Sequence, residues 1–205
     1  MGTTSRVHNL SASFVLGYHG CDRETGERLL RNEAFEPSEN NFAWLGPGIY
    51  FWEANPDRAL AWAKEKVERQ SVQDSSAIEP FVVGAVIELG YCLDLISSNG
   101  ISALKNSHME LVALLGESGV PLPENKGGDD LLLRKLDCAV IKYLHQSRSK
   151  QGEPAFETVR GVFTEGEQIY PNAGFRAKTH IQICVIKPAM IKGVCRVPES
   201  HFTGL

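Results

Sequence analysis

Residues 46–53 read Gly-Pro-Gly-Ile-Tyr-Phe-Trp-Glu, the most informative stretch of this sequence. Two glycines around a proline, followed by four residues that favour β-structure, predict a loop that leads into a strand. Side chains alternate across a strand, so at least one of Tyr50, Phe51 and Trp52 points away from the others. An aromatic face beside an accessible glycine backbone suits a flat heteroaromatic ring. The same pattern is also that of aromatic residues filling a core.

Upstream, residues 14–19 are expected to form a short strand that ends in Tyr18-His19-Gly20. A histidine at a strand end is more often a structural hydrogen-bonding group than a catalytic one. The glycine after it leaves the backbone open to a ligand, because no side chain blocks the approach. This second motif is therefore compatible with a structural role or with a binding site.

Downstream, a loop rich in Gly, Pro and Asn leads into an expected strand at residues 179–187. In that strand His180 and Gln182 share one face, opposite a continuous apolar face. The pattern fits either a solvent-facing strand or a groove wall on which His180 and Gln182 face a ligand.

Hydrophobic spacing and capping residues predict the remaining elements. They are helices at 22–31, 55–70, 104–115 and 132–144, a polar loop at 146–155, and strands at 81–89, 158–163 and 192–197. Strict alternation of strands and helices fails toward the end of the chain, which argues against a doubly wound parallel sheet. The sequence therefore predicts a single α+β domain over residues 1–205.

Composition excludes several classes of protein. With 205 residues, 42% hydrophobic and 22% charged, the chain is not collagen-like, coiled-coil or wholly disordered. Its five cysteines are scattered without a C-x-x-C pair, so we expect neither a disulfide framework nor a metal site. No apolar run approaches the roughly 18 residues of a membrane span, and the N-terminus lacks a signal-peptide core. We therefore expect a cytoplasmic protein without a membrane partner.

Charge is distributed unevenly along the chain. The formal net charge is −4, yet residues 142–196 carry nine basic and four acidic side chains. Such asymmetry is compatible with a local anionic partner but does not establish one.

Together the three motifs resemble the ADP-ribosyltransferase superfamily, and most closely its diphtheria-toxin-like branch, which includes the poly(ADP-ribose) polymerases. The signature of that branch is a histidine, a tyrosine and a glutamate from three strands. The resemblance covers about residues 14–197. It implies split, mainly antiparallel sheets with flanking helices, and NAD as substrate without a metal.

The resemblance also implies roles for individual residues. His19 would hold the adenosine-side ribose of NAD, the Gly20 backbone would bind the nicotinamide amide, and Tyr50 would stack on the nicotinamide ring, with Phe51 beside it. Breaking the nicotinamide–ribose bond develops an oxocarbenium-like ribose. The protein must therefore hold the leaving ring and place negative or dipolar charge near the cation.

The sequence departs from the signature at its third position. Gln182 falls near the family's glutamate; it can accept a hydrogen bond from a ribose hydroxyl, but it supplies no charge and cannot act as a base. Glu165 and Glu167 in the preceding loop, and Glu53 after the second motif, are the alternative sources of a carboxylate.

In this superfamily the loop before the third motif usually sets the acceptor. Here it holds Tyr170, Phe175, Arg176 and Lys178. Aromatic and cationic side chains there could stack a nucleobase and hold a phosphate. Alternatively, Arg176 and Lys178 could bind the NAD pyrophosphate, and we include His180 among the NAD contacts.

The sequence therefore predicts NAD-dependent mono-ADP-ribosyl transfer to a nucleic acid or a protein. The resemblance implies a bacterial toxin or phage-defence setting, in which an antitoxin would be a partner. Three alternatives stay open: hydrolysis of NAD, a module that binds NAD or ADP-ribose without turnover, and an interaction protein that uses the fold as a scaffold.

Overall fold

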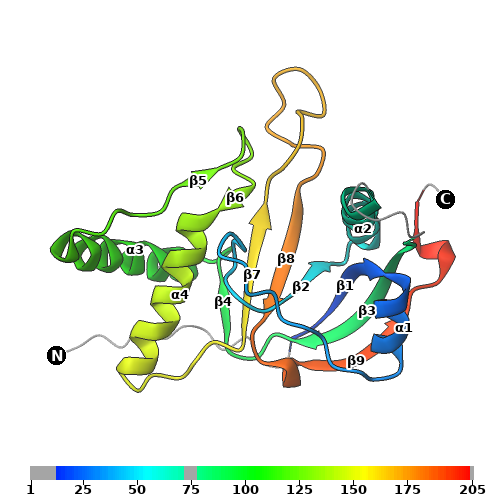
Figure 1. The fold of residues 1–205 in the computed structure, drawn as a ribbon, viewed down its shortest axis with the longest axis horizontal. Helices are drawn as coiled ribbons and strands as arrows, with labels where there is room; N and C mark the ends of the chain where they lie inside the picture. The colour runs from blue at the N-terminus through cyan, green and yellow to red at the C-terminus, as the bar shows by residue number, and fades with distance from the viewer. Residues whose placement is uncertain (1–12, 72–77, 204–205) are drawn as a thin grey trace.

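The computed structural model of the chain describes residues 13–71 and 78–203, and Figure 1 shows their arrangement. The described residues form a mixed seven-stranded sheet and four α-helices, which makes the protein α+β, as expected. In spatial order the strands are β4 (Cys92–Asp94), β7 (Thr158–Phe163), β8 (His180–Val185), β2 (Ile49–Glu53), β1 (Phe14–Asp22), β3 (Pro80–Glu88) and β9 (Ile191–Arg196). Neighbouring strands are antiparallel except β4 and β7.

The helices pack around this sheet. They are α1 (Arg23–Leu30), α2 (Pro56–Ser71), α3 (Ser98–Ser118), α4 (Lys135–Lys150), and the 3₁₀ helices η1 (Pro188–Met190) and η2 (Glu199–His201). A separate ribbon consists of β5 (Asn125–Lys126) and β6 (Leu133–Arg134). Figure 1 shows α3 and α4 at the β4 end of the sheet and α2 beside β1 and β3.

The pairing of β1 with β2 is short. These strands pair only at Gly17–Glu53 and Tyr18–Trp52, whereas β1 pairs with β3 along its whole length. The expected split sheets are thus joined into one sheet through two residue pairs. Beyond Tyr18 the backbones of β1 and β2 no longer pair, so His19 and Gly20 lie past the end of this pairing.

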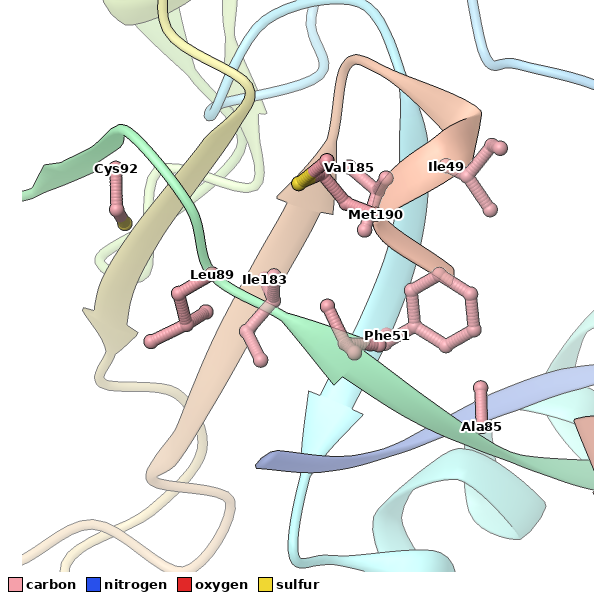
Figure 2. Close-up of a cluster of buried hydrophobic side chains, with 9 residues drawn as sticks. Ile49, Phe51, Ala85, Leu89, Cys92, Ile183, Val185 and Met190 are labelled. Atoms are coloured by element: carbon pink, nitrogen blue, oxygen red, sulfur yellow. The ribbon is translucent and has the colours of Figure 1, made fainter. Parts of the chain in front are cut away.

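The two faces of the sheet bury different sets of side chains. Phe51 is fully buried on one face, with Ile49 of the same strand and Ile183 of β8 (Figure 2). Tyr50 and Trp52 point to the opposite face, as strand alternation requires. On that face Tyr50 packs against a cluster that includes α4, and Trp52 packs against α2. Both α4, near Tyr50, and α2, near Trp52, therefore cover this same face of the sheet.

The element boundaries differ from the sequence expectation at α4. The helix begins at Lys135, so Leu132 and Leu133 precede it and are largely exposed. It extends to Lys150, through part of the segment expected to be a loop. Arg148 and Lys150 lie in its last turn, where positive charge is favourable to the helix dipole. Strand β4 was not expected, because three residues are too few for a periodic pattern.

Gly20 allows α2 to approach β1 closely. A Cβ at this position would lie 2.3 Å from the carbonyl oxygen of Ala59 in α2. The absence of a side chain, which the sequence analysis attributed to ligand access, is thus required by helix packing.

We therefore predict that Gly20→Ala lowers the free energy of unfolding by about 1–3 kcal/mol, because the α2 backbone must move. Gly193→Ala in β9 is the matched control, since an added Cβ there meets no described atom within 4 Å. Urea-induced unfolding measures both variants. Equal stability of the two variants would contradict the close packing of α2 on β1.

Candidate functional site

A cleft of about 940 Å³ opens between α2 and the loops that flank β2 and β8. All three sequence motifs contribute to its walls. The motif residues that line it are His19, Gly20, Gly48, Tyr50, Trp52, His180 and Gln182. The sequence segments that these residues represent are far apart along the chain, so the fold brings them together.

His19 links the first two motifs. Its Nδ1 donates a hydrogen bond to the backbone carbonyl of Tyr50 at 2.8 Å. Since a carbonyl only accepts, Nδ1 carries the hydrogen, and the neutral ring keeps a lone pair on Nε2. Burial lowers the pKa of His19 below 6.5, which favours this neutral form. The rings of Phe35 and Phe51 pack against the imidazole, with centroids 5.4 and 5.6 Å away.

Tyr50 holds the loop that precedes its strand. Its hydroxyl donates to the carbonyl of Gly46 at 2.7 Å and accepts from the amide of Leu45 at 3.0 Å. Burial raises the pKa of Tyr50 well above its usual value of 10, so the group stays protonated. The hydroxyl is therefore a structural anchor, and the aromatic ring is the part that a ligand in the cleft could contact.

Gln182 lies opposite Trp52 in the β2–β8 pairing. Its Oε1 accepts a hydrogen bond from Nε1 of Trp44 at 2.6 Å. Because an indole nitrogen only donates, the amide oxygen must be the atom that faces Trp44. Gln182 can then offer a ligand its amide N–H groups and the second lone pair of Oε1.

His180 is 6% exposed and lies at the start of β8. Its Nδ1 donates to the carbonyl of Lys178 at 2.6 Å. Burial, with the positive charge of Arg58 nearby, lowers its pKa, and this outweighs the opposing effects of the bond to Lys178 and of Glu165. The ring is thus a neutral imidazole in the cleft wall.

Of the three carboxylates proposed from the sequence, Glu165 is the one that lines the cleft. Its oxygens accept hydrogen bonds from Arg58 at 3.1 and 3.3 Å, and Lys178 lies 3.6 Å away. Glu53 instead forms a two-pronged ion pair with Arg160, at 2.6 and 2.8 Å. Neither Glu53 nor Glu167 is part of the cleft wall, so Glu165 is the candidate that the geometry retains.

Several residues expected to contact ligands do not line the cleft. Phe51 is buried on the other face of the sheet, because neighbouring residues of a strand point in opposite directions. Arg176 donates to the carbonyl of Gly166 in its own loop. Tyr170 and Phe175 are more than half exposed, and Lys178 is paired with Glu65 at 3.0 Å and with Glu165.

The loop that carries these side chains extends past the end of the sheet (Figure 1). The amide of Gly166 donates to Asp130 at 2.9 Å, which ties the loop to the segment that joins β5 and β6. Tyr170, Phe175, Arg176 and Lys178 therefore lie outside the cleft wall, and Tyr170 and Phe175 are exposed on this loop.

The sequence analysis missed the basic and aromatic residues that α2 contributes. Arg58, Trp62 and Lys66 all line the cleft and are spaced four residues apart, which places them on one face of the helix. Nζ of Lys66 lies 5.5 Å from the centroid of Trp62. Arg28 of α1 lines the cleft as well. The four-residue spacing of Arg58, Trp62 and Lys66 is the signal in the sequence that places them on one face, but this spacing does not reveal a cleft.

Comparison with known proteins adds one distant relative. An uncharacterized protein of the archaeon Methanocaldococcus jannaschii, MJ0359, is 26% identical over 194 residues, an alignment that covers 85% of this chain and 83% of the relative. No family model and no solved structure matches the chain.

Two further observations concern residues 13–71 and 78–203. No helix among them is long and apolar enough to cross a membrane. They also contain no group of three or more His, Cys, Asp or Glu side chains that could hold a metal ion.

We predict that Tyr50→Phe lowers the free energy of unfolding by about 1–3 kcal/mol, because it leaves the Leu45 amide and the Gly46 carbonyl without their partner. Tyr170→Phe removes an exposed hydroxyl and should change stability by less than about 0.5 kcal/mol. Urea titration of both variants checks this. A Tyr50→Phe variant as stable as Tyr170→Phe would show that the hydroxyl does not hold the loop.

Three histidines should make the free energy of unfolding depend on pH. The pKa values of His19, His145 and His180 are lowered in the fold, mainly by burial. The unfolded chain therefore binds more protons as the pH falls below about 6.5, and the free energy of unfolding should decrease from there downward. The pKa values of Asp22 and Glu157 are also lowered, and these carboxylates stop stabilising the fold only near pH 4, where they become protonated. Stability that stays constant between pH 6.5 and 5 would contradict this assignment.

Proposed function

We propose that this protein cleaves NAD at the nicotinamide–ribose bond and transfers ADP-ribose to an acceptor. The observation that carries the proposal is the hydrogen bond from His19 to the Tyr50 backbone, which joins two of the three signature motifs in one cleft. Gln182 and His180, from the third motif, line the same cleft.

The size and chemistry of the cleft suit a dinucleotide. Its volume of about 940 Å³ lies at the upper end of the range of ligand sites, about 300–1,000 Å³. Trp44, Tyr50 and Trp62 offer aromatic surface for the two rings of NAD. Arg28 and Lys66 offer positive charge for the diphosphate that joins its halves.

The residues of the cleft match the needs of the reaction. As the glycosidic bond breaks, its electron pair leaves with nicotinamide, and positive charge develops on the ribose. The Tyr50 ring would hold the departing pyridine, and Nε2 of His19 would accept a hydrogen bond from a ribose hydroxyl. Glu165 lies in the cleft wall, near the place where the resemblance expects a glutamate on the strand, and its carboxylate is paired with Arg58 and Lys178.

The test uses NAD labelled in its adenylate phosphate, incubated with the protein in a cell extract. We expect released nicotinamide and transferred label. Loss of the label on nuclease treatment identifies a nucleic acid as the acceptor, and loss on protease treatment identifies a protein. Free ADP-ribose alone would favour a hydrolase. NAD that stays intact while protecting the protein against heat unfolding would favour a binding module. If NAD is neither cleaved nor protective, the protein does not recognise NAD.

For the variant His19→Asn we predict a kcat/KM for nicotinamide release about tenfold lower, the factor for one lost hydrogen bond of about 1.4 kcal/mol. Asparagine can still donate to the Tyr50 carbonyl, but it lacks Nε2. His145→Asn changes another buried imidazole, packed against Phe156 outside the cleft, and should leave the rate unchanged. Equal rates of nicotinamide release for His19→Asn and His145→Asn would show that His19 does not contribute to the site.

A further inference from the structure

One wall of the cleft contains buried polar atoms without partners. Nε2 of His180, Nε1 of Trp52 and Nε of Arg58 form no hydrogen bond with any described residue. The three side chains lie together: the rings of Trp52 and His180 are 6.2 Å apart, and the Arg58 guanidinium is 5.9 Å from a Trp52 ring. Buried polar atoms are normally paired, so a ligand in this cleft that has its own donors and acceptors could satisfy these three atoms.

The three atoms differ in what they can do. The indole and guanidinium nitrogens can only donate. Nε2 of His180 is an acceptor, because Nδ1 carries the ring hydrogen and donates it to the carbonyl of Lys178 at 2.6 Å. This bond fixes both the tautomer and the direction of the ring. Among these three unpaired atoms, Nε2 of His180 is thus the one that can receive a proton.

The other polar groups of this wall are less suited to that task. The amide of Gln182 is not basic, and its oxygen is bound to Trp44. Both oxygens of Glu165 already accept hydrogen bonds from Arg58, and Lys178 shares its charge. Glu165 therefore orients Arg58 and neutralises it beside the imidazole. Besides Arg58 from α2 and Glu165 from the loop, the ring is bordered by Trp52 of β2 and Phe163 of β7.

On this basis, and resting on the proposed function, we propose that His180 is the catalytic base of the transfer. The C1′–nitrogen bond of NAD breaks and its electron pair leaves with neutral nicotinamide. The acceptor's oxygen or nitrogen then bonds to C1′, and its proton passes to Nε2 of His180 and from there to water. The acceptor is thus a nucleophile that loses a proton on attack, such as a hydroxyl, an amino group or water. The imidazole would supply the basicity that Gln182 lacks.

The test compares His180→Asn with the wild type and with His145→Asn. Asparagine can still donate to the Lys178 carbonyl, so the start of β8 keeps its anchor. We expect kcat for nicotinamide release in cell extract to fall about 10²–10⁴-fold, with KM for NAD and heat protection by NAD little changed. His145→Asn, which alters a buried histidine with an unpartnered Nε2 outside the cleft, should keep the wild-type kcat.

Two further readouts separate a base from a structural residue. The wild-type kcat should rise with pH through a pKa below 6.5, and this inflection should be absent from His180→Asn. Added imidazole should restore part of the rate to His180→Ala but not to His19→Asn. If His180→Asn does not fold, His180→Gln, with a non-basic amide, provides the same comparison.

The outcomes are distinguishable. A wild-type kcat in a folded His180→Asn or His180→Gln variant, or a lost rate that imidazole cannot restore, overturns the role of His180 and leaves the proposed function standing. No nicotinamide release from the wild type overturns the proposed function, and the role of His180 with it.

Discussion

The hydrogen bond from His19 Nδ1 to the carbonyl of Tyr50 joins β1 and β2 just where their backbone pairing has ended. A side chain bridges the two strands there, so they stay connected without closing against each other. The Tyr50 hydroxyl continues the connection to Leu45 and Gly46, and Trp44, next to them, donates to Gln182. One chain of contacts therefore links the three motifs, and the cleft depends on it.

In Tyr50, His19 and His180, one polar atom holds the side chain in place, and another part of the same side chain faces the site. The Tyr50 hydroxyl and the Nδ1 atoms of His19 and His180 are engaged with the backbone. The Tyr50 ring and the Nε2 atoms of His19 and His180 take no part in these bonds, and Nε2 of His180 is buried. Since each ring is held through its other polar atom, a ligand would meet groups that are already oriented, which reduces the entropy lost on binding. Burial keeps both imidazoles neutral.

Local patterns predicted most elements, because strand alternation and helix capping depend on neighbouring residues. Asp22, for example, caps α1, and its side chain accepts a hydrogen bond from the Thr25 amide. Helix α3, expected over 104–115, begins earlier, at Ser98. Contacts across long distances could not be predicted in this way. Strand alternation puts Phe51 on the opposite face from Tyr50, but the sequence does not show which of the two faces carries the cleft. Likewise, no residue near Gly20 in the sequence indicates that Ala59 of α2 lies against it. Which glutamate lies in the cleft could not be predicted either. Glu165 is held there by Arg58, and Glu53 is held away from it by Arg160, and each arginine is 107 residues from its partner.

Amide hydrogen exchange with and without NAD tests most directly whether one cleft built from the three motifs binds this dinucleotide. We predict slower exchange on NAD binding around residues 19–21, 44–50 and 180–182, and unchanged exchange in α3, far from the cleft. Protection confined to other segments, or exchange that NAD does not alter anywhere, would contradict the claim.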